Sequence, residues 1–283
     1  MNVNSIRRRA IELSRHNFRL LVPSFYLINC VTLIAQYSSS GLIMIAIELL
    51  LVTLVHGFIY MSLILIHEKR NDFSINEIFI GIFHFAKYFP SYIVRKLLIL
   101  IPTFVLLVPM FLEVTRLNNI PLYTVIDQFV YLFLSKTVRY DFFAIIGIQN
   151  ISFVMVIFLV LALVVGGYLS GLFLLVPYIV EDYDYAWNEA LIKSTRMMNG
   201  HVKDFIKLLV LLIPYYLIHL VVTFILSQFC FAIPYIGFSL YLILSMLSII
   251  IFWQIPFYQS IAIFYLEVRN EEIIKHPHEL FKI

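Results

Sequence analysis

Four polar or ionisable residues stand inside long apolar stretches of this 283-residue chain, where water is scarce. Glu48, His56 and Tyr60 follow one another at spacings of eight and four residues, which places them on one face of a helix. His219 lies in a later apolar stretch, at a predicted depth similar to that of Glu48. A carboxylate at the centre of a bilayer costs about 2.5–3.5 kcal/mol to insert, so we expect Glu48 to face the interior of a helix bundle and to pair with His219. Such a pair suits either a structural contact or proton transfer along a polar path.

Elsewhere the sequence lacks the patterns of known catalytic and metal sites. It contains no Walker loop, HExxH motif, nucleophile elbow or EF-hand, and Cys30 and Cys230 have no metal-type spacing. We therefore expect no catalytic residue, no metal ion and no cofactor, and a protein that is not an enzyme. The acidic turn 181–184 is interpreted as a helix boundary whose carboxylates cap the following helix. A cation site is the alternative interpretation of this turn.

One small-residue pattern predicts close helix packing. Gly167 and Gly171, with Gly166 beside them, form a small-xxx-small face of the kind that lets a second helix approach closely. The pattern indicates packing and does not indicate catalysis.

The composition is that of a membrane protein. Hydrophobic residues make up 62% of the chain, charged residues make up 13%, and the mean hydropathy is +0.94. The formal net charge is +3, but the basic residues flank apolar runs and form no patch of their own, so we expect no nucleic-acid partner.

The apolar runs predict an all-α fold, a polytopic membrane bundle of six transmembrane helices. A bilayer core about 30 Å thick needs roughly 20 apolar residues in helical form. The stretches that meet this requirement are 18–37, 41–66, 91–112, 151–180, 203–228 and 235–266. Pro256 is expected to kink the last of them.

The distribution of basic residues predicts the orientation. Of the 20 Lys and Arg residues, only Arg116, Lys136 and Arg139 fall on the side opposite the N terminus. The positive-inside rule then gives a multi-pass protein of a bacterial cell membrane with both termini in the cytoplasm. The segment 114–149 is predicted to be an external loop with an amphipathic helix, because apolar residues recur at helical spacing from Leu122 to Phe133.

An internal repeat organises the chain. Residues 76–102 align without a gap on residues 188–214, and Asn-Glu opens both segments while Ile-Pro closes both. The single integral-membrane domain 1–283 is thereby divided into units 1–70, 71–184 and 185–283. Each unit is predicted to be a cytoplasmic amphipathic helix followed by an antiparallel pair of spans. These amphipathic helices either lie on the inner leaflet with Lys and Arg toward anionic head groups, or dock a partner.

Three segments carry a resemblance to a known family. They are VPYIVEDYDYAWNEALIKSTRMMNGHVKDFIKL (176–208), RRRAIELSRHNF (7–18) and IPFYQSIAIFYLEV (255–268). The chain resembles the bacterial integral-membrane family called domain of unknown function 975, whose pattern is a Pro-Tyr span end, an acidic turn, an Ala-Leu-x-x-Ser helix and a Gly-His stop. The matching residues are Pro177, Tyr178, Glu181, Ala190, Leu191, Ser194, Gly200 and His201. The resemblance implies the membrane architecture and no particular activity.

Two classes of function follow from these patterns. The first is a non-enzymatic accessory, scaffold or protective protein that works through helix packing and its cytoplasmic helices. The second is a transporter of protons or a small substrate that uses Glu48, His56 and His219. The expected partners are the lipid bilayer with its anionic head groups and either another membrane protein or a second copy of the chain.

Overall fold

The computed structural model describes residues 1–37, 41–67, 75–127, 152–183 and 185–275, and every regular element in these ranges is helical. The elements are α1 (Val3–His16), α2 (Phe18–Tyr37), α3 (Gly41–His67), η1 (Ile75–Phe79), α4 (Ile80–Phe83), α5 (Phe85–Asn118), α8 (Phe153–Leu172), α9 (Val176–Tyr183), α10 (Trp187–Met198), α11 (Val202–Cys230), α12 (Gly237–Ile249), η3 (Ile250–Gln254) and α13 (Ile255–Lys275). The predicted all-α class is confirmed for this part of the chain.

Five helical segments are long and apolar enough to cross a membrane: Ile45–Ile66, Phe85–Leu117, Phe153–Tyr183, Val202–Cys230 and Gly237–Ile274. α1 and α2 meet at an angle of 92°. If they are counted together as one broken span, the number of membrane-crossing segments becomes six. The third predicted span is longer than expected. It begins at Phe85 and continues to Asn118, so residues 114–118, predicted to be loop, are helical.

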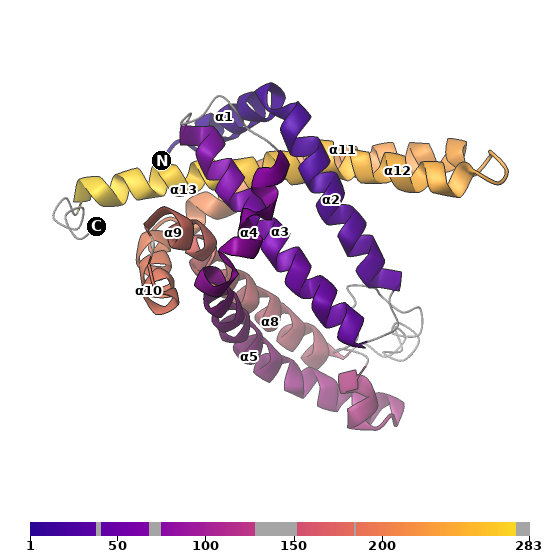
Figure 1. Cartoon of the computed structure of the whole chain (residues 1–283). Coiled ribbons are helices and arrows are strands. Elements are labelled where there is room, and N and C mark those ends of the chain that lie inside the picture. The colour runs from indigo at the N-terminus through magenta and orange to yellow at the C-terminus, as the bar shows by residue number, and fades with distance from the viewer. Residues whose placement is uncertain (38–40, 68–74, 128–151, 184, 276–283) are drawn as a thin grey trace.

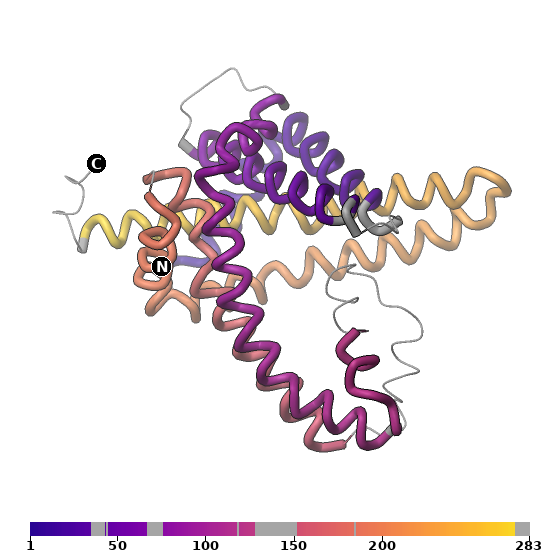
Figure 2. The backbone as a smooth tube through the Cα atoms, turned by 60° about the horizontal axis from the view of Figure 1, so that its bottom comes forward, coloured from indigo at the N-terminus to yellow at the C-terminus, as the bar shows by residue number. Residues whose placement is uncertain are grey.

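The long helices pack as neighbouring pairs along the chain. α2 packs on α3, α5 packs on α8, and α11 packs on α12. The three pairs diverge from a common region where α1, α9, α10 and α13 gather (Figures 1 and 2).

The short helices join one part of the chain to another. α1 packs on α13 and α11, η1 and α4 pack on α3, and α10 packs on α9. The buried side of α1 is a stripe at helical spacing, Val3, Ile6, Ala10 and Ser14. α10 buries Ala190, Leu191 and Ser194 in the same way, and Ser194 Oγ donates a hydrogen bond of 2.7 Å to the Leu172 carbonyl. The buried faces of α1 and α10 are therefore covered by helices of the same chain, and the expectation that they lie on the lipid surface needs this correction.

Two glycines permit the contact between α3 and the short helices η1 and α4. A Cβ atom at Gly57 would lie 1.8 Å from the Ile78 carbonyl oxygen, and one at Gly81 would lie 2.0 Å from the Thr53 carbonyl oxygen. The predicted glycine face is different. A Cβ atom at Gly167 would meet nothing within 4 Å, and one at Gly171 would meet only Phe205, at 3.9 Å. The neighbouring Gly166 does face a second helix closely, since a Cβ atom there would lie 3.0 Å from Thr103 Oγ1 of α5. The closest helix approaches thus fall at glycines that the small-xxx-small pattern did not identify.

The order of short helix, break and long helix recurs in all three predicted units. The breaks are at Asn17, at His84 and at Asn199–His201, where Gly200 has a φ of 92° and ends α10 as the sequence predicts. The register of the gapless repeat differs at the break, since Pro102 lies 17 residues beyond Phe85 and Pro214 lies 12 residues beyond Val202. The repeat itself stays a prediction.

The first turn of the predicted external amphipathic helix lies within the described residues. Residues 122–127 are helical, and Val125, 5% exposed, packs with Phe111 and Val114 near the end of α5. The remainder of the predicted stripe, including Phe129 and Phe133, lies outside the described residues.

The last long segment changes its helix type just before Pro256. A π-helical turn, η3, immediately precedes Ile255–Pro256 and separates α12 from α13. Proline lacks the N–H that an α-helix would use at this position, so a wider turn ahead of it accommodates the ring. The kink itself stays a prediction.

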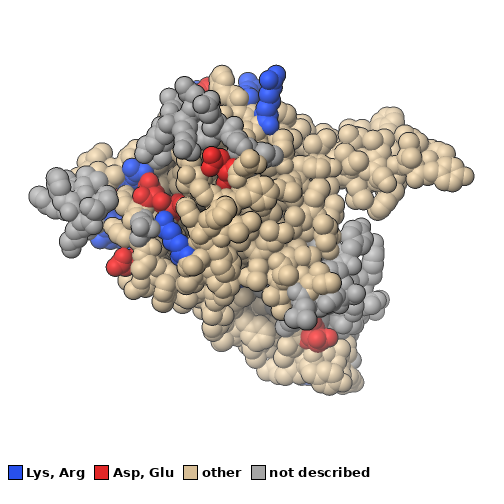
Figure 3. Space-filling view, in the orientation of Figure 1, with Lys and Arg blue, Asp and Glu red and all other residues tan. Residues whose placement is uncertain are grey.

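Most charged side chains on the visible face lie where the three pairs converge, and a further acidic group lies at the far end of the α5–α8 pair (Figure 3). The α11–α12 pair, which extends to the right in this view, is uncharged on this face (Figure 3). Such a separation of charged from apolar surface is typical of a protein with one end in water and its helices in lipid.

Candidate functional site: a buried carboxylate and an amphipathic cavity

A carboxylate at the end of α9 brings three elements together. Glu181 Oε1 contacts His56 Nε2 of α3, and the same oxygen lies 3.2 Å from His84 Nδ1, in the residue between α4 and α5. The side chains of Glu181 and His56 are 3% and 4% exposed. A buried carboxylate needs compensation by hydrogen bonds or positive charge, and two imidazoles supply it here.

Aromatic rings enclose this cluster. The Tyr88 ring stacks on His56 with 3.7 Å between ring centroids, and Tyr60 meets His84 edge-on at 6.1 Å. The stacking fixes the plane of the His56 imidazole and therefore the direction in which its Nε2 points. His56 and Tyr60, predicted to share a face of one helix, both join this cluster.

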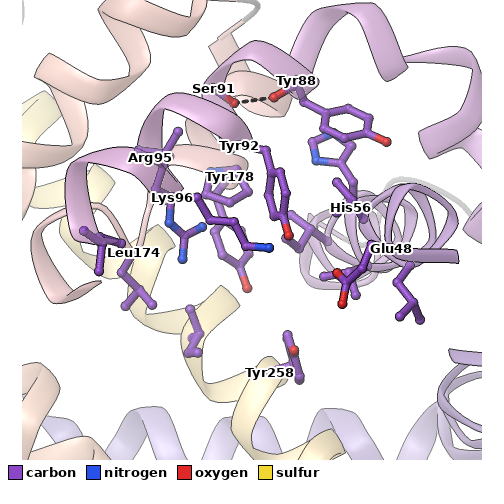
Figure 4. A pocket seen from close by; sticks show the side chains of 18 of the residues that line it. Glu48, His56, Tyr88, Ser91, Tyr92, Arg95, Lys96, Leu174, Tyr178 and Tyr258 are labelled. Carbon is purple, nitrogen blue, oxygen red and sulfur yellow. Dashed lines mark hydrogen bonds between the residues drawn. The ribbon is translucent and has the colours of Figure 1, made fainter. Parts of the chain in front are cut away.

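A cavity of about 420 Å³ lies next to the cluster, between α3, α5, α9 and α13 (Figure 4). Glu48 and His56 line it from α3, and Arg95 and Lys96 line it from α5. Most of the remaining wall is aliphatic or aromatic, formed by Leu51, Val52, Val55, Ile59, Tyr88, Tyr92, Ile99, Leu174, Val176, Pro177, Tyr178, Phe257, Tyr258 and Ile261. The cavity is amphipathic, with its cations on one wall and a carboxylate on another.

The two cations of α5 are weakly compensated by the protein. Within the described ranges, neither Arg95 nor Lys96 forms an ion pair. The Lys96 ammonium lies 4.9 Å from the centroid of the Tyr92 ring, and both side chains extend toward the space between the helices (Figure 4). A partly buried guanidinium without a counterion is costly, so the cavity favours an anion.

A second carboxylate of the acidic turn, that of Asp182, links α9 to α13 by hydrogen bonds. Asp182 Oδ2 accepts hydrogen bonds from the Tyr265 hydroxyl at 2.6 Å and from Arg269 Nη1 at 2.7 Å. The N-cap of α10 is Ala186, which has no side-chain capping bond. The predicted helix boundary is present, since α9 ends at Tyr183 and α10 begins at Trp187, but Glu181 and Asp182 do not cap α10, because both bond to side chains of other elements. Asp184, the third carboxylate of this turn, lies outside the described residues.

Further ion pairs tie α13 to the short helices. Arg9 of α1 bonds to Glu267, and Arg196 Nε of α10 lies 2.8 Å from Glu272. Together with the Asp182–Arg269 pair, they concentrate charge compensation at the end where the helices converge.

His219 lies away from this cavity, between α11 and α12. Its Nδ1 lies 3.0 Å from Ser248 Oγ on α12 and 3.2 Å from Thr223 Oγ1 one turn along α11. Glu48 lines the cavity, where His219 is absent from the lining. The expected pairing of Glu48 with His219 is wrong, since equal depth in a bilayer does not bring helices of different pairs together.

Sequence reasoning missed Glu181, His84 and Arg95 as members of one region. A signal was present, since an acidic turn that ends an apolar run must find partners somewhere. This signal could not identify the partners, because His56 and His84 lie 125 and 97 residues before Glu181 in the chain.

The described residues include no group of three or more His, Cys, Asp or Glu side chains arranged to hold a metal ion. The alternative of a cation site at the acidic turn thus finds no ligand set in this part of the chain. The chain matches no protein-family model, and no curated protein and no solved structure matches it either. The resemblance to the family domain of unknown function 975 stays a prediction.

Proposed function

We propose that the chain is a non-enzymatic accessory or scaffold protein of a bacterial cell membrane. In this proposal six spans form three antiparallel hairpins, α2–α3, α5–α8 and α11–α12/α13, and both termini are cytoplasmic. The convergent end holds the hairpins in fixed directions, and the hairpins present apolar surface to lipid or to a membrane-protein partner.

The supporting observation is that the chain itself covers little of the apolar surface of four of its five long spans. In the most apolar window of α3, 67% of the residues are buried, whereas the corresponding windows of the other four spans are 11–22% buried. Side chains such as Phe224 and Phe229 on α11 are 67% and 70% exposed. Surfaces this apolar must be covered by lipid or protein in the membrane.

The second candidate is the transporter, and the buried Glu181–His56–His84 cluster favours it. Ionisable groups inside membrane segments often mark proton paths. The residue set differs from the predicted one, because His219 lies on another pair of helices. It becomes Glu48, His56, His84 and Glu181, around and beside the cavity.

One experiment separates the two candidates. The purified chain is reconstituted in liposomes that contain a pH-sensitive dye, and a pH gradient is imposed. The scaffold proposal expects the proton leak of protein-free liposomes, unchanged in Glu181→Gln. Flux well above that leak, lost in Glu181→Gln and kept in the control Glu12→Gln at an exposed position of α1, would replace the scaffold with the transporter.

A second measurement tests the scaffold directly. Spin labels at Ile34 on α2 and Tyr235 between α11 and α12, in a background with Cys30 and Cys230 replaced by Ser, report the distance between two arms. A rigid scaffold gives one distance distribution, and this distribution is the same with and without the imposed gradient. A distribution that shifts with the gradient contradicts it.

A further inference from the structure

We propose that the cavity between α3, α5, α9 and α13 binds the phosphodiester headgroup of a membrane glycerophospholipid, with Arg95 and Lys96 as its phosphate contacts. This site is independent of the scaffold proposal, because a scaffold and a transporter could each hold such a lipid.

The donor groups match a phosphate. Arg95 offers a planar fork that can bond two phosphate oxygens, and the adjacent Lys96 supplies a point charge. The Tyr92 and Tyr258 hydroxyls also line the cavity, as additional donors (Figure 4). An anion here would provide the counterion that the protein itself does not provide for Arg95.

The position along α5 matches the level of lipid head groups. Residues 97–112, directly after Lys96, contain no charged side chain, and at 1.5 Å per residue they span about 24 Å of hydrocarbon. Arg95 and Lys96 therefore stand at the boundary of the apolar run, on its cytoplasmic side in the proposed topology. A headgroup at this boundary leaves its acyl chains to follow the apolar surfaces between the diverging helix pairs.

The cavity's size and charge narrow the ligand class. A volume of about 420 Å³ accommodates a headgroup and glycerol but not two full acyl chains, so the chains must leave it. The lining holds two cations and one carboxylate, Glu48, besides His56, which is engaged by Glu181. This surplus of one positive charge suits a singly charged phosphodiester better than a doubly charged phosphomonoester.

The test uses the full-length chain, purified in detergent and stripped of lipid, with the shift in Tm as the measure of binding. The probes are dioleoyl phosphatidylglycerol, dioleoylglycerol, which has the same chains and no phosphate, and glycerophosphoglycerol, which has the same phosphodiester and no acyl chains. The variants are Arg95→Gln/Lys96→Gln and the control Lys207→Gln, which removes a basic residue aligned with Arg95 in the repeat but 68% exposed.

We expect a saturable rise in Tm with phosphatidylglycerol and none with dioleoylglycerol. The double variant should need about tenfold more phosphatidylglycerol for the same rise, whereas Lys207→Gln should match the unmodified chain. If the double variant does not fold, Arg95→Lys, which keeps the charge but loses the fork, is expected to weaken binding several-fold.

Three results would overturn the proposal. Dioleoylglycerol raising Tm as much as phosphatidylglycerol would show that the phosphate is irrelevant. Glycerophosphoglycerol acting as strongly as the lipid would reassign the cavity to a soluble anion. Unchanged binding in both the double variant and Arg95→Lys would place the lipid elsewhere.

Discussion

Glu181 shows how a membrane protein retains a carboxylate among apolar helices. Its partners come from the middle of α3 and from the junction of α4 and α5, so one side chain links three parts of the chain. Histidines suit this role, because an imidazole nitrogen accepts or donates a hydrogen bond according to its protonation. The cluster serves as a structural junction in the scaffold and would be the proton-carrying group in the transporter.

Removal of this carboxylate should destabilise the protein. Glu181→Ala leaves the buried His56 ring without its partner, which typically costs about 1–3 kcal/mol and should lower Tm by about 2–10 °C. Glu181→Gln keeps an acceptor and the side-chain volume, so its Tm should fall less. Fluorescence of Trp187 and Trp253 during heating in detergent measures both. Glu12→Gln, at an exposed position of α1, is the control, and a Tm for Glu181→Ala no lower than that of this control would contradict the prediction.

At the scale of single residues, the sequence predicted which groups require partners better than it predicted the partners. His56 and Tyr60 share a face of α3 because helical spacing is a local property. The pairing of Glu48 with His219 failed because it relied on depth alone, whereas contacts depend on which helices are neighbours. Arg95 appeared in the sequence only as a topology signal, and its place in a cavity follows from the packing of four helices.

The contact between α3 and the pair η1–α4 depends on backbone approach. Because a Cβ at Gly57 would overlap the Ile78 carbonyl, Gly57→Ala must push η1 away from α3. Overpacking of this kind costs about 1–3 kcal/mol, so we expect Tm to fall by about 2–10 °C. Gly167→Ala is the matched control, since it adds the same methyl group to a long helix in open space. Equal Tm values for the two variants would mean that the close approach is absent in the membrane.

α2 is held to the π-helical turn by a reciprocal amide pair. Asn29 Nδ2 donates to Gln254 Oε1 at 2.7 Å, and Gln254 Nε2 donates to Asn29 Oδ1 at 3.0 Å. In a double-mutant cycle with Asn29→Leu and Gln254→Met, we expect a coupling energy of about 0.6 kcal/mol, with an upper range near 1.7 kcal/mol. Unfolding in denaturant at constant detergent measures the four proteins. Strictly additive effects would show that the two amides do not interact.

At the scale of elements, the apolar runs located the long helices within a few residues at most ends. The extension of α5 from Phe85 to Asn118 was missed, because Lys87, Arg95 and Lys96 interrupt the hydropathy while leaving the helix intact. The packing of α1 and α10 on helices of the same chain was also missed. A one-sided apolar stripe looks the same whether lipid or protein covers it.

At the scale of the whole molecule, the short helices link the three predicted units in a closed series. α1 of the first unit packs on α13 of the third, η1 and α4 of the second pack on α3 of the first, and α10 of the third packs on α9 of the second. This arrangement agrees with a parallel repeat around an axis along the membrane normal, although the gapless alignment is shifted at the helix breaks.

Reporter fusions test the proposed orientation. A fusion after Ile120, beyond the end of α5, should report the outer side, and fusions after Tyr185 and at the C terminus should report the cytoplasm. The reason is the asymmetry of Lys and Arg, of which only three of 20 lie on the predicted outer side. A paired phosphatase and fluorescent-protein reporter at each site gives opposite signals for the two sides. Cytoplasmic fluorescence at Ile120 would exclude the six-span topology.

The packing of α1 on α13 has a consequence for biogenesis. Arg9 and Glu267 are 258 residues apart, so α1 lacks its contact with α13 until this interval has been translated, although α11 becomes available earlier. At about 5–20 residues per second, the ribosome needs roughly 13–50 s to cover that interval. During this time the apolar stripe of α1 is available to the membrane surface, to a chaperone or to another nascent chain. α1 is thus synthesised well before α13, the helix that covers much of its buried face.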